Sequence, residues 1–183
     1  MERRIILCDL YQPVIDAWER AFAGCPDVEV RRGDLTELPA DAYVSAANSF
    51  GEMGGGVDWA LRERFGYEIE DRVMETIAQL HGRLPVGLAL IVETGDGEVP
   101  YLIVAPTMEV PSNVAHTQNA YAAMCAVLLQ WRDFEREHPD EILTIVVPGL
   151  CTGTGMMNPH TAAGQMRRAY DEFQADGGVD GAV

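Results

Sequence analysis

A glycine-rich loop with two polar side chains follows an apolar run of the chain. Gly54, Gly55 and Gly56 let the backbone approach a ligand closely, because no Cβ atom intervenes. The helix start behind them supplies unpaired N–H groups for an anion. The Asn48 amide can donate and accept hydrogen bonds, and the Asp58 carboxylate can orient a hydroxyl group or a water. The simpler alternative is a flexible turn, but the entropy cost of three glycines favours a ligand-binding loop.

A second loop of small residues runs from residue 149 to residue 159. Its two hydroxyl groups and successive backbone amides suit a phosphate cradle. No Gly-Lys-Ser/Thr follows, so it is not a P-loop, which argues against ATP or GTP hydrolysis. Cys151 leaves open a nucleophilic thiol, with His160 as the one histidine near it in sequence.

Both loops lie between an expected strand and an expected helix. Short apolar or alternating runs predict strands at residues 4–7, 28–31, 42–47, 88–94, 101–104 and 143–147. Apolar residues at helical spacing predict helices at residues 13–22, 57–65, 69–80, from about 113 to 131, and 162–173. The turn at Gly95-Asp96-Gly97 predicts a hairpin. This alternation predicts a largely parallel sheet covered on both sides, with ligands at the carboxyl ends of its strands.

The length of 183 residues suits one domain, and no linker or structural repeat divides it. We expect this domain to span residues 1–173. Residues 174–183 lack periodicity and are predicted to form a flexible C-terminal tail.

The charge and the cysteines exclude several classes of function. The 13 basic and 29 acidic residues give a net charge of −16, which repels a duplex nucleic acid but not a small anion held by backbone amides. The sequence shows no apolar run suited to a signal peptide or a membrane span. The four cysteines form no CxxC pair and no zinc-finger spacing. We therefore expect a cytoplasmic protein with no metal, no membrane and no duplex nucleic acid among its partners.

Five motifs, in order, resemble those of the macrodomain, the ADP-ribose-binding module. They are Gly33-Asp34-Leu35-Thr36, Ala46-Ala47-Asn48, Gly54 to Asp58, Val104-Ala105-Pro106 and Gly149 to Thr154. Together they cover the chain from about Val28 to Phe173. The resemblance implies a single α/β domain, a three-layer α-β-α sandwich with a mixed, largely parallel sheet of about six strands. It implies no cofactor.

The resemblance also implies roles by position. Asp34 would accept a hydrogen bond from the adenine amino group, with the backbone of Leu35 beside it. Asn48 would bind the distal ribose, and in hydrolytic members of the family Asn48 and Asp58 orient this ribose or a water for attack. The remaining implied ligand-binding residues wrap the distal ribose and the diphosphate: Gly54, Gly55, Gly56, Val57, Cys151, Thr152, Gly153, Thr154 and Gly155.

Two functions follow from this resemblance. One is an enzyme that binds ADP-ribose or a similar nucleotide and hydrolyses ADP-ribosyl esters, releasing ADP-ribose from ADP-ribosylated protein or deacylating O-acyl-ADP-ribose. The alternative is a non-catalytic ADP-ribose reader or a nucleotide-signal sensor. The Asn48 and Asp58 pair favours the enzyme. Ser45, Trp59 and Arg62 depart from the family pattern, and of these Trp59 and Arg62 favour the reader, the first by crowding the site and the second by holding the ligand's anion.

Overall fold

The computed structural model describes residues 3–180. Its strands are β1 (Arg4–Asp9), β2 (Val28–Arg32), β3 (Ala42–Ser45), β4 (Leu90–Glu93), β5 (Tyr101–Val104) and β6 (Thr144–Val147). Its α-helices are α1 (Gln12–Ala21), α2 (Gly56–Phe65), α3 (Glu68–Gln79), α4 (Asn119–Glu137) and α5 (Pro159–Ala175). Two short 3-10 helices are η1 (Leu35–Glu37) and η2 (Gly178–Asp180). No helix within residues 3–180 is both long and apolar enough to cross a bilayer.

The six strands form one mixed sheet in the order β2-β1-β6-β3-β5-β4. All neighbours are parallel except β4 and β5, which form the antiparallel hairpin expected from the glycine turn. β6 lies between β1 and β3, as its buried, β-branched sequence predicts for a central strand. The predicted fold class is therefore confirmed.

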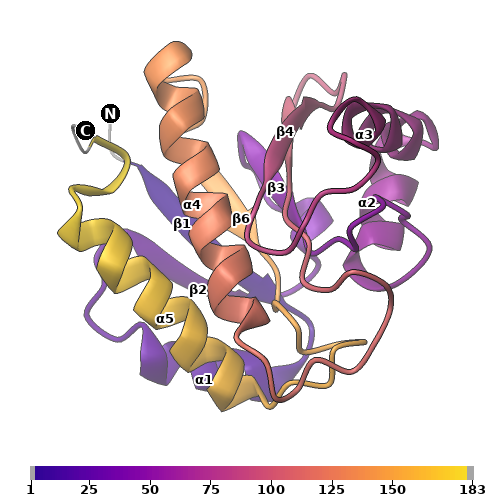
Figure 1. Cartoon of the computed structure of the whole chain (residues 1–183). Coiled ribbons are helices and arrows are strands. Elements are labelled where there is room, and N and C mark those ends of the chain that lie inside the picture. The colour runs from indigo at the N-terminus through magenta and orange to yellow at the C-terminus, as the bar shows by residue number, and fades with distance from the viewer. Residues whose placement is uncertain (1–2, 181–183) are drawn as a thin grey trace.

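Helices cover both faces of the sheet (Figure 1). Alternate residues of each strand enter different cores: Ile5 and Leu7 face one core, whereas Ile6 and Cys8 face the other. α1, α4 and α5 contribute to the first core, which is the larger one, and α2 and α3 contribute to the second, smaller core. The result is the expected three-layer sandwich.

The parallel pairing determines where loops can meet. The carboxyl ends of β1, β6, β3 and β5 lie side by side along one edge of the sheet, because these four strands are successive and parallel. With neighbouring strands about 4.8 Å apart, this row spans roughly 14 Å. The end of β2 lies one strand further out, at the edge of the sheet.

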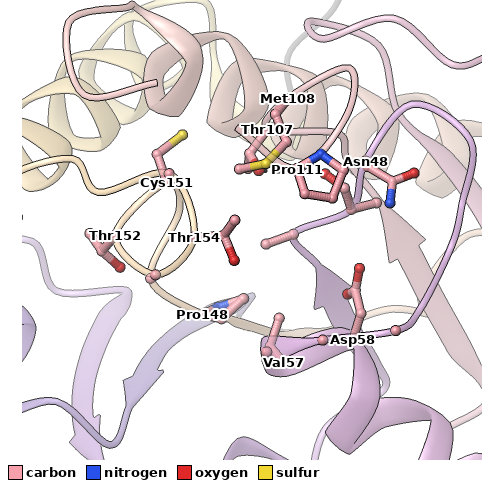
Figure 2. Close-up of a pocket in the computed structure, with 18 of the residues that line it drawn as sticks. Asn48, Val57, Asp58, Thr107, Met108, Pro111, Pro148, Cys151, Thr152 and Thr154 are labelled. Atoms are coloured by element: carbon pink, nitrogen blue, oxygen red, sulfur yellow. Dashed lines mark hydrogen bonds between the residues drawn. The ribbon is translucent and has the colours of Figure 1, made fainter. Parts of the chain in front are cut away.

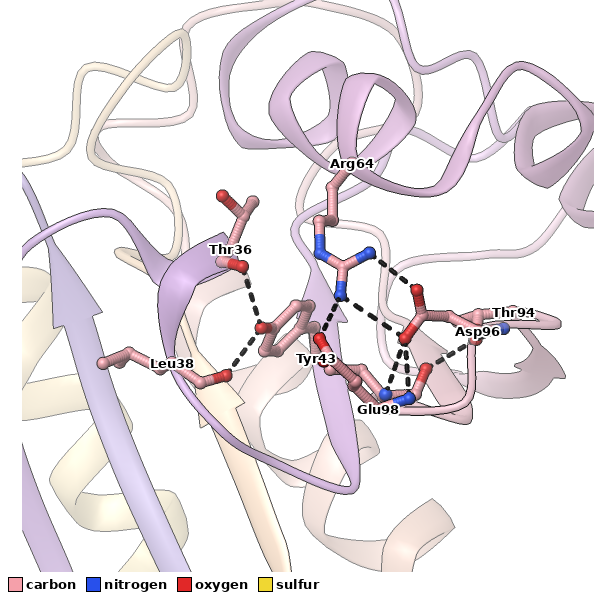
Figure 3. Close-up of polar contacts among 8 residues, drawn as sticks. Thr36, Leu38, Tyr43, Arg64, Thr94, Asp96 and Glu98 are labelled. Carbon is pink, nitrogen blue, oxygen red and sulfur yellow. Dashed lines mark hydrogen bonds and ion pairs between the residues drawn. The ribbon is translucent and has the colours of Figure 1, made fainter.

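A polar network fixes α2 to the β4–β5 hairpin (Figure 3). Arg64 of α2 donates to the Asp96 carboxylate at 2.6 Å, and the backbone N–H groups of Glu98 and Val99 donate to the same carboxylate. The Arg64 guanidinium and these two N–H groups lower the pKa of Asp96 to about 2. This network holds the end of α2 opposite to the glycine loop.

Helix α4 begins later than its apolar pattern predicts. The pattern suggests a start near Asn113, but α4 begins at Asn119. Side chains in the intervening segment bond to nearby backbone instead: Asn113 accepts from the Ala115 N–H at 2.9 Å, and Thr117 donates to the Val114 carbonyl at 2.8 Å. Such local hydrogen bonds compete with helix formation.

The C-terminal helix ends later than predicted. Gln174 and Ala175 belong to α5, and Val179 of η2 packs against the core formed with α1, α4 and α5. Residues 181–183 lie outside the described residues. The domain boundary at 173 and the flexible tail stay predictions.

We predict that Trp131→Ala lowers the free energy of unfolding by about 3–5 kcal/mol. Trp131 is buried in the larger core, and its indole N–H donates to the Ile142 carbonyl at 2.8 Å, so truncation leaves both a cavity and an unpaired carbonyl. Urea denaturation measures the change. Leu129→Ala on the exposed side of the same helix serves as the control and should cost less than about 1 kcal/mol. Equal losses for the two variants would contradict this view of the core.

Candidate functional site

A cavity of about 630 Å³ lies over the carboxyl ends of β1, β6, β3 and β5. Each of these strands contributes one segment to its lining, within residues 9–11, 148–155, 46–58 and 107–111 respectively. Figure 2 shows the loops after β3 and β6 facing each other across this space. Every residue predicted for the site lines the cavity except Asp34 and Leu35.

The Asn48 amide holds its own loop together. Its Oδ1 accepts from the N–H groups of Phe50 and Glu52, at 2.9 and 3.4 Å, and its Nδ2 donates to the Glu52 carbonyl at 3.2 Å. Asn48 lines the cavity, so the second hydrogen of Nδ2 is the part of the amide left for a ligand.

The three consecutive glycines are not equivalent. A Cβ atom at Gly54 or Gly55 would meet no atom within 4 Å, and neither residue has a positive φ. Gly56 has a φ of 59°, where side chains are rarely tolerated, so its glycine serves the backbone conformation. The fold itself does not require glycine at 54 and 55, and both line the cavity, so their bare backbone keeps this space open.

Glu70 of α3 anchors the glycine loop from behind. Its Oε1 accepts from the Met53 N–H at 2.7 Å, and its Oε2 accepts from Arg62 Nη1 at 2.7 Å. Arg62 also lies over the Tyr67 ring and does not line the cavity. Trp59 is half-exposed on α2 and likewise lies outside the lining. The expectation that Trp59 crowds the site and Arg62 holds the ligand's anion is therefore not supported by their positions.

Asp58 is a buried carboxyl group on the first turn of α2 that borders the cavity. It is 5% exposed, and its Oδ1 accepts from the Ser45 hydroxyl, itself buried, at 2.7 Å. Burial and, to a smaller extent, the negative charge of Glu70 raise the pKa of Asp58 to about 7, against the opposing effect of the Ser45 hydrogen bond. Figure 2 shows its carboxylate projecting into the space between the two loops. Such a group can take up or release a proton near neutral pH.

Two sets of unpaired backbone N–H groups border the cavity. Gly55, at the N-cap of α2, has no side chain to accept from the first-turn N–H groups of the helix. Opposite, the N–H groups of Thr152, Gly153 and Thr154 donate to no acceptor among residues 3–180. Successive free amides of this kind bind anions even in an acidic protein.

The loop after β6 is shaped by its own backbone. A Cβ at Gly155 would lie 2.5 Å from the Cys151 carbonyl oxygen and 2.7 Å from Val114, so this glycine permits the tight turn. The Met157 N–H donates to the same Cys151 carbonyl at 2.9 Å. These contacts hold the free amides in place.

Cys151 contributes backbone rather than a reactive thiol. Its φ of 66° turns the loop, its side chain belongs to the larger core, and burial raises the pKa of its thiol to about 12. A thiolate nucleophile is therefore disfavoured at neutral pH.

The structure does not bring Asp34 and Leu35 into the cavity. Asp34 follows the edge strand β2, and its carboxylate accepts from the N–H and the hydroxyl of Thr36, at 2.9 and 2.7 Å. Leu35 is buried in the smaller core. The strand β1 lies between them and the loop after β6.

The roles of Asp34 and Leu35 at the adenine stay predictions. The cavity also contains Asp9 and Tyr11, which the sequence analysis does not identify as site residues. Both follow β1, which pairs directly with β6. The available signal was their position between a strand and a helix, which is the same position that the two glycine loops occupy. The lining also includes Thr107, Met108 and Pro111, which follow β5 and which the sequence analysis does not identify.

No group of three or more histidine, cysteine, aspartate or glutamate side chains within residues 3–180 is arranged to hold a metal ion.

Comparisons with known proteins agree with this architecture. The profile of the Macro domain family matches residues 44–166, and the chain therefore belongs to the macrodomain family. An uncharacterized protein of Aquifex aeolicus is 32% identical over 148 residues, covering 81% of this chain and 83% of its own. A macro domain-containing protein of Listeria monocytogenes is 30% identical over 129 residues, 69% of each chain.

Solved macrodomain structures share the fold. The macrodomain of Mycobacterium tuberculosis DarG superposes with a TM-score of 0.62 at 20% identity, over 77% of this chain and 88% of its own. A point mutant of the Oceanobacillus iheyensis macrodomain, solved with ADP-ribose, gives a TM-score of 0.63 at 19% identity, over 77% of this chain and 74% of its own.

We predict that Asp58→Asn stabilises the protein at neutral pH and that this gain disappears in acid. The native state keeps a proton on Asp58 up to about pH 7, whereas the unfolded chain loses it near pH 4, so this group makes stability fall as pH rises between these values. The difference in free energy of unfolding between variant and wild type should grow by up to about 1.4 kcal/mol per pH unit in this range. Urea denaturation at several pH values measures it, and a difference independent of pH would contradict the assignment.

Proposed function

We propose that the protein binds ADP-ribose or an ADP-ribose-like nucleotide in this cavity. The observation that carries the proposal is the pair of free amide sets, at the start of α2 and at residues 152–154, on opposite sides of one cavity. A diphosphate between them would meet donors from both sides. The volume lies within the range usual for small-molecule sites. The ADP-ribose in the Oceanobacillus iheyensis structure supports the same class of ligand.

Within this proposal, the distal ribose lies over the end of β3. Asn48 and Asp58 border the cavity there, and both are polar groups that can bond to sugar hydroxyls. Gly54 and Gly55 leave room beside them. The rest of the ligand extends past the loop after β6.

We further propose that the protein hydrolyses ADP-ribosyl esters. A water held by Asp58 attacks the anomeric carbon of the distal ribose and loses a proton to the carboxylate, while the bond from this carbon to the ester oxygen breaks and a free carboxylate leaves. A pKa near 7 suits a group that accepts a proton at neutral pH. The free amides hold the diphosphate and so keep the reacting carbon in place.

The alternative is a non-catalytic reader or nucleotide-signal sensor, which needs the same cavity. One observation favours it: the Asn48 amide is largely engaged by its own loop, which leaves a single hydrogen for the ribose. An enzyme and a reader therefore differ in turnover and not in binding.

Calorimetry tests the binding. ADP-ribose should bind more tightly than AMP, because AMP lacks the diphosphate and the second ribose. Gly55→Glu should abolish binding and leave the protein folded, because its side chain enters open space in the cavity and adds a negative charge. Gly97→Glu, at an open position of the distant hairpin, is the matched control and should bind normally. Equal affinity for AMP and ADP-ribose, or normal binding by folded Gly55→Glu, would overturn the proposal.

Release of ADP-ribose from ester-linked ADP-ribosylated protein tests the catalysis. The wild-type rate should rise with pH through about 7, as Asp58 ionises. Asp58→Asn should lose about 100-fold or more in rate and bind ADP-ribose within about fivefold of wild type. A wild-type protein that binds ADP-ribose and releases none would establish the reader instead.

A further inference from the structure

The end of the cavity over β1 carries a carboxylate that the proposed reaction does not use. Asp9 is the last residue of β1 and lines the cavity next to the loop after β6. Asp58 lies on the other side of that loop, because β6 separates β1 from β3. A nucleotide with its diphosphate on the loop after β6 and its distal ribose at Asp58 therefore extends its adenosine end toward Asp9.

Backbone N–H groups hold the Asp9 carboxylate in position. Oδ1 accepts from the Tyr11 N–H at 2.8 Å, and Oδ2 accepts from the Gly149 N–H at 3.2 Å. The Gly149 N–H is thus taken by Asp9, whereas the N–H groups of residues 152–154 remain free. The amides that are free to bind a phosphate therefore do not include the Gly149 N–H, which contacts the Asp9 carboxylate.

The structure makes room for this carboxylate. A Cβ at Gly149 would lie 2.5 Å from Asp9 Oδ2 and 2.5 Å from the Thr152 hydroxyl oxygen, so a side chain at this position would displace both groups from the strand end. An ionised carboxylate accepts hydrogen bonds and donates none. A ligand group at this end must therefore bring donors.

Positive charge that could offset the carboxylate is directed elsewhere. Arg32 is the partner of Asp9 in the register of β2, but it does not line the cavity, and its Nε donates to the Leu10 carbonyl at 3.3 Å. No cation within residues 3–180 forms an ion pair with Asp9, and none lines this cavity. A phosphate placed here would meet a negative charge without compensation.

Resting on the proposed function, we propose that Asp9 is a specificity-determining residue that selects a nucleotide with free hydroxyl groups on its adenosine ribose. The 2′- and 3′-hydroxyls are neighbouring donors, which the two carboxylate oxygens can accept. A phosphate on this ribose removes a donor and adds repulsion, so Asp9 excludes the phosphorylated nucleotide. Exclusion of a competing ligand by charge is a common source of specificity.

The test compares the dissociation constants of ADP-ribose and ADP-ribose 2′-phosphate by calorimetry. Wild-type protein should prefer ADP-ribose at least tenfold, and Asp9→Asn, which keeps the size of the side chain and removes its charge, should reduce this preference at least fivefold. Asp16→Asn removes an exposed carboxylate of α1 that bonds to Gln12, and as the control it should keep the wild-type preference.

The outcomes separate this inference from the binding proposal. Wild-type protein that binds neither nucleotide overturns the proposed function. If the wild-type dissociation constants for the two nucleotides differ by less than threefold, or if the 2′-phosphate binds more tightly, the role of Asp9 is overturned and the binding proposal stands. This comparison needs no variant. An Asp9→Asn variant that melts like wild type and keeps the full wild-type preference for ADP-ribose would also overturn the role of Asp9.

Discussion

The parallel pairing of β1, β6, β3 and β5 is the constraint on which the site depends. It places four strand ends in one row, and each end leads into a segment that lines the same cavity. The loop after β6 lies within this row, so a polar side chain lies on either side of its free amides. Asp58 comes from the segment that follows β3, and Asp9 is the last residue of β1. An elongated ligand with a central anion matches this order, since its anion meets amides and its ends meet acceptors.

The ionised form of Asp58 in the site lowers the stability of the fold. Burial of Asp58 disfavours its charged form, and Glu70, which anchors Met53 and Arg62 behind the glycine loop, adds repulsion. The Ser45 hydroxyl offsets part of this effect. Ser45 is one of the residues that depart from the family pattern, and its hydroxyl is the side-chain donor to this carboxylate. A buried, ionisable group in a cavity is typical of functional sites.

The sequence predicts the elements and both glycine loops well, because hydrophobic periodicity and glycine clusters are local signals. No local signal in the sequence predicts the order of the strands in the sheet. This order places Asp9, at the end of β1, in the lining of the cavity and Asp34, after the edge strand β2, outside the lining. The positions of the Trp59 and Arg62 side chains outside the cavity depend on how α2 packs against α3. The spacing of residues along the chain does not predict this packing. The start of α4 depends on side-chain hydrogen bonds of Asn113 and Thr117 that compete with the helix.

A crystal structure of the protein with ADP-ribose tests the central claim most directly. We expect the diphosphate between the start of α2 and the N–H groups of residues 152–154, the distal ribose beside Asp58, and the adenosine ribose within hydrogen-bond distance of Asp9. A ligand that lies in the reverse direction, with its adenosine at Asp58, or that places its adenosine ribose away from Asp9 and toward Asp34, would contradict the account.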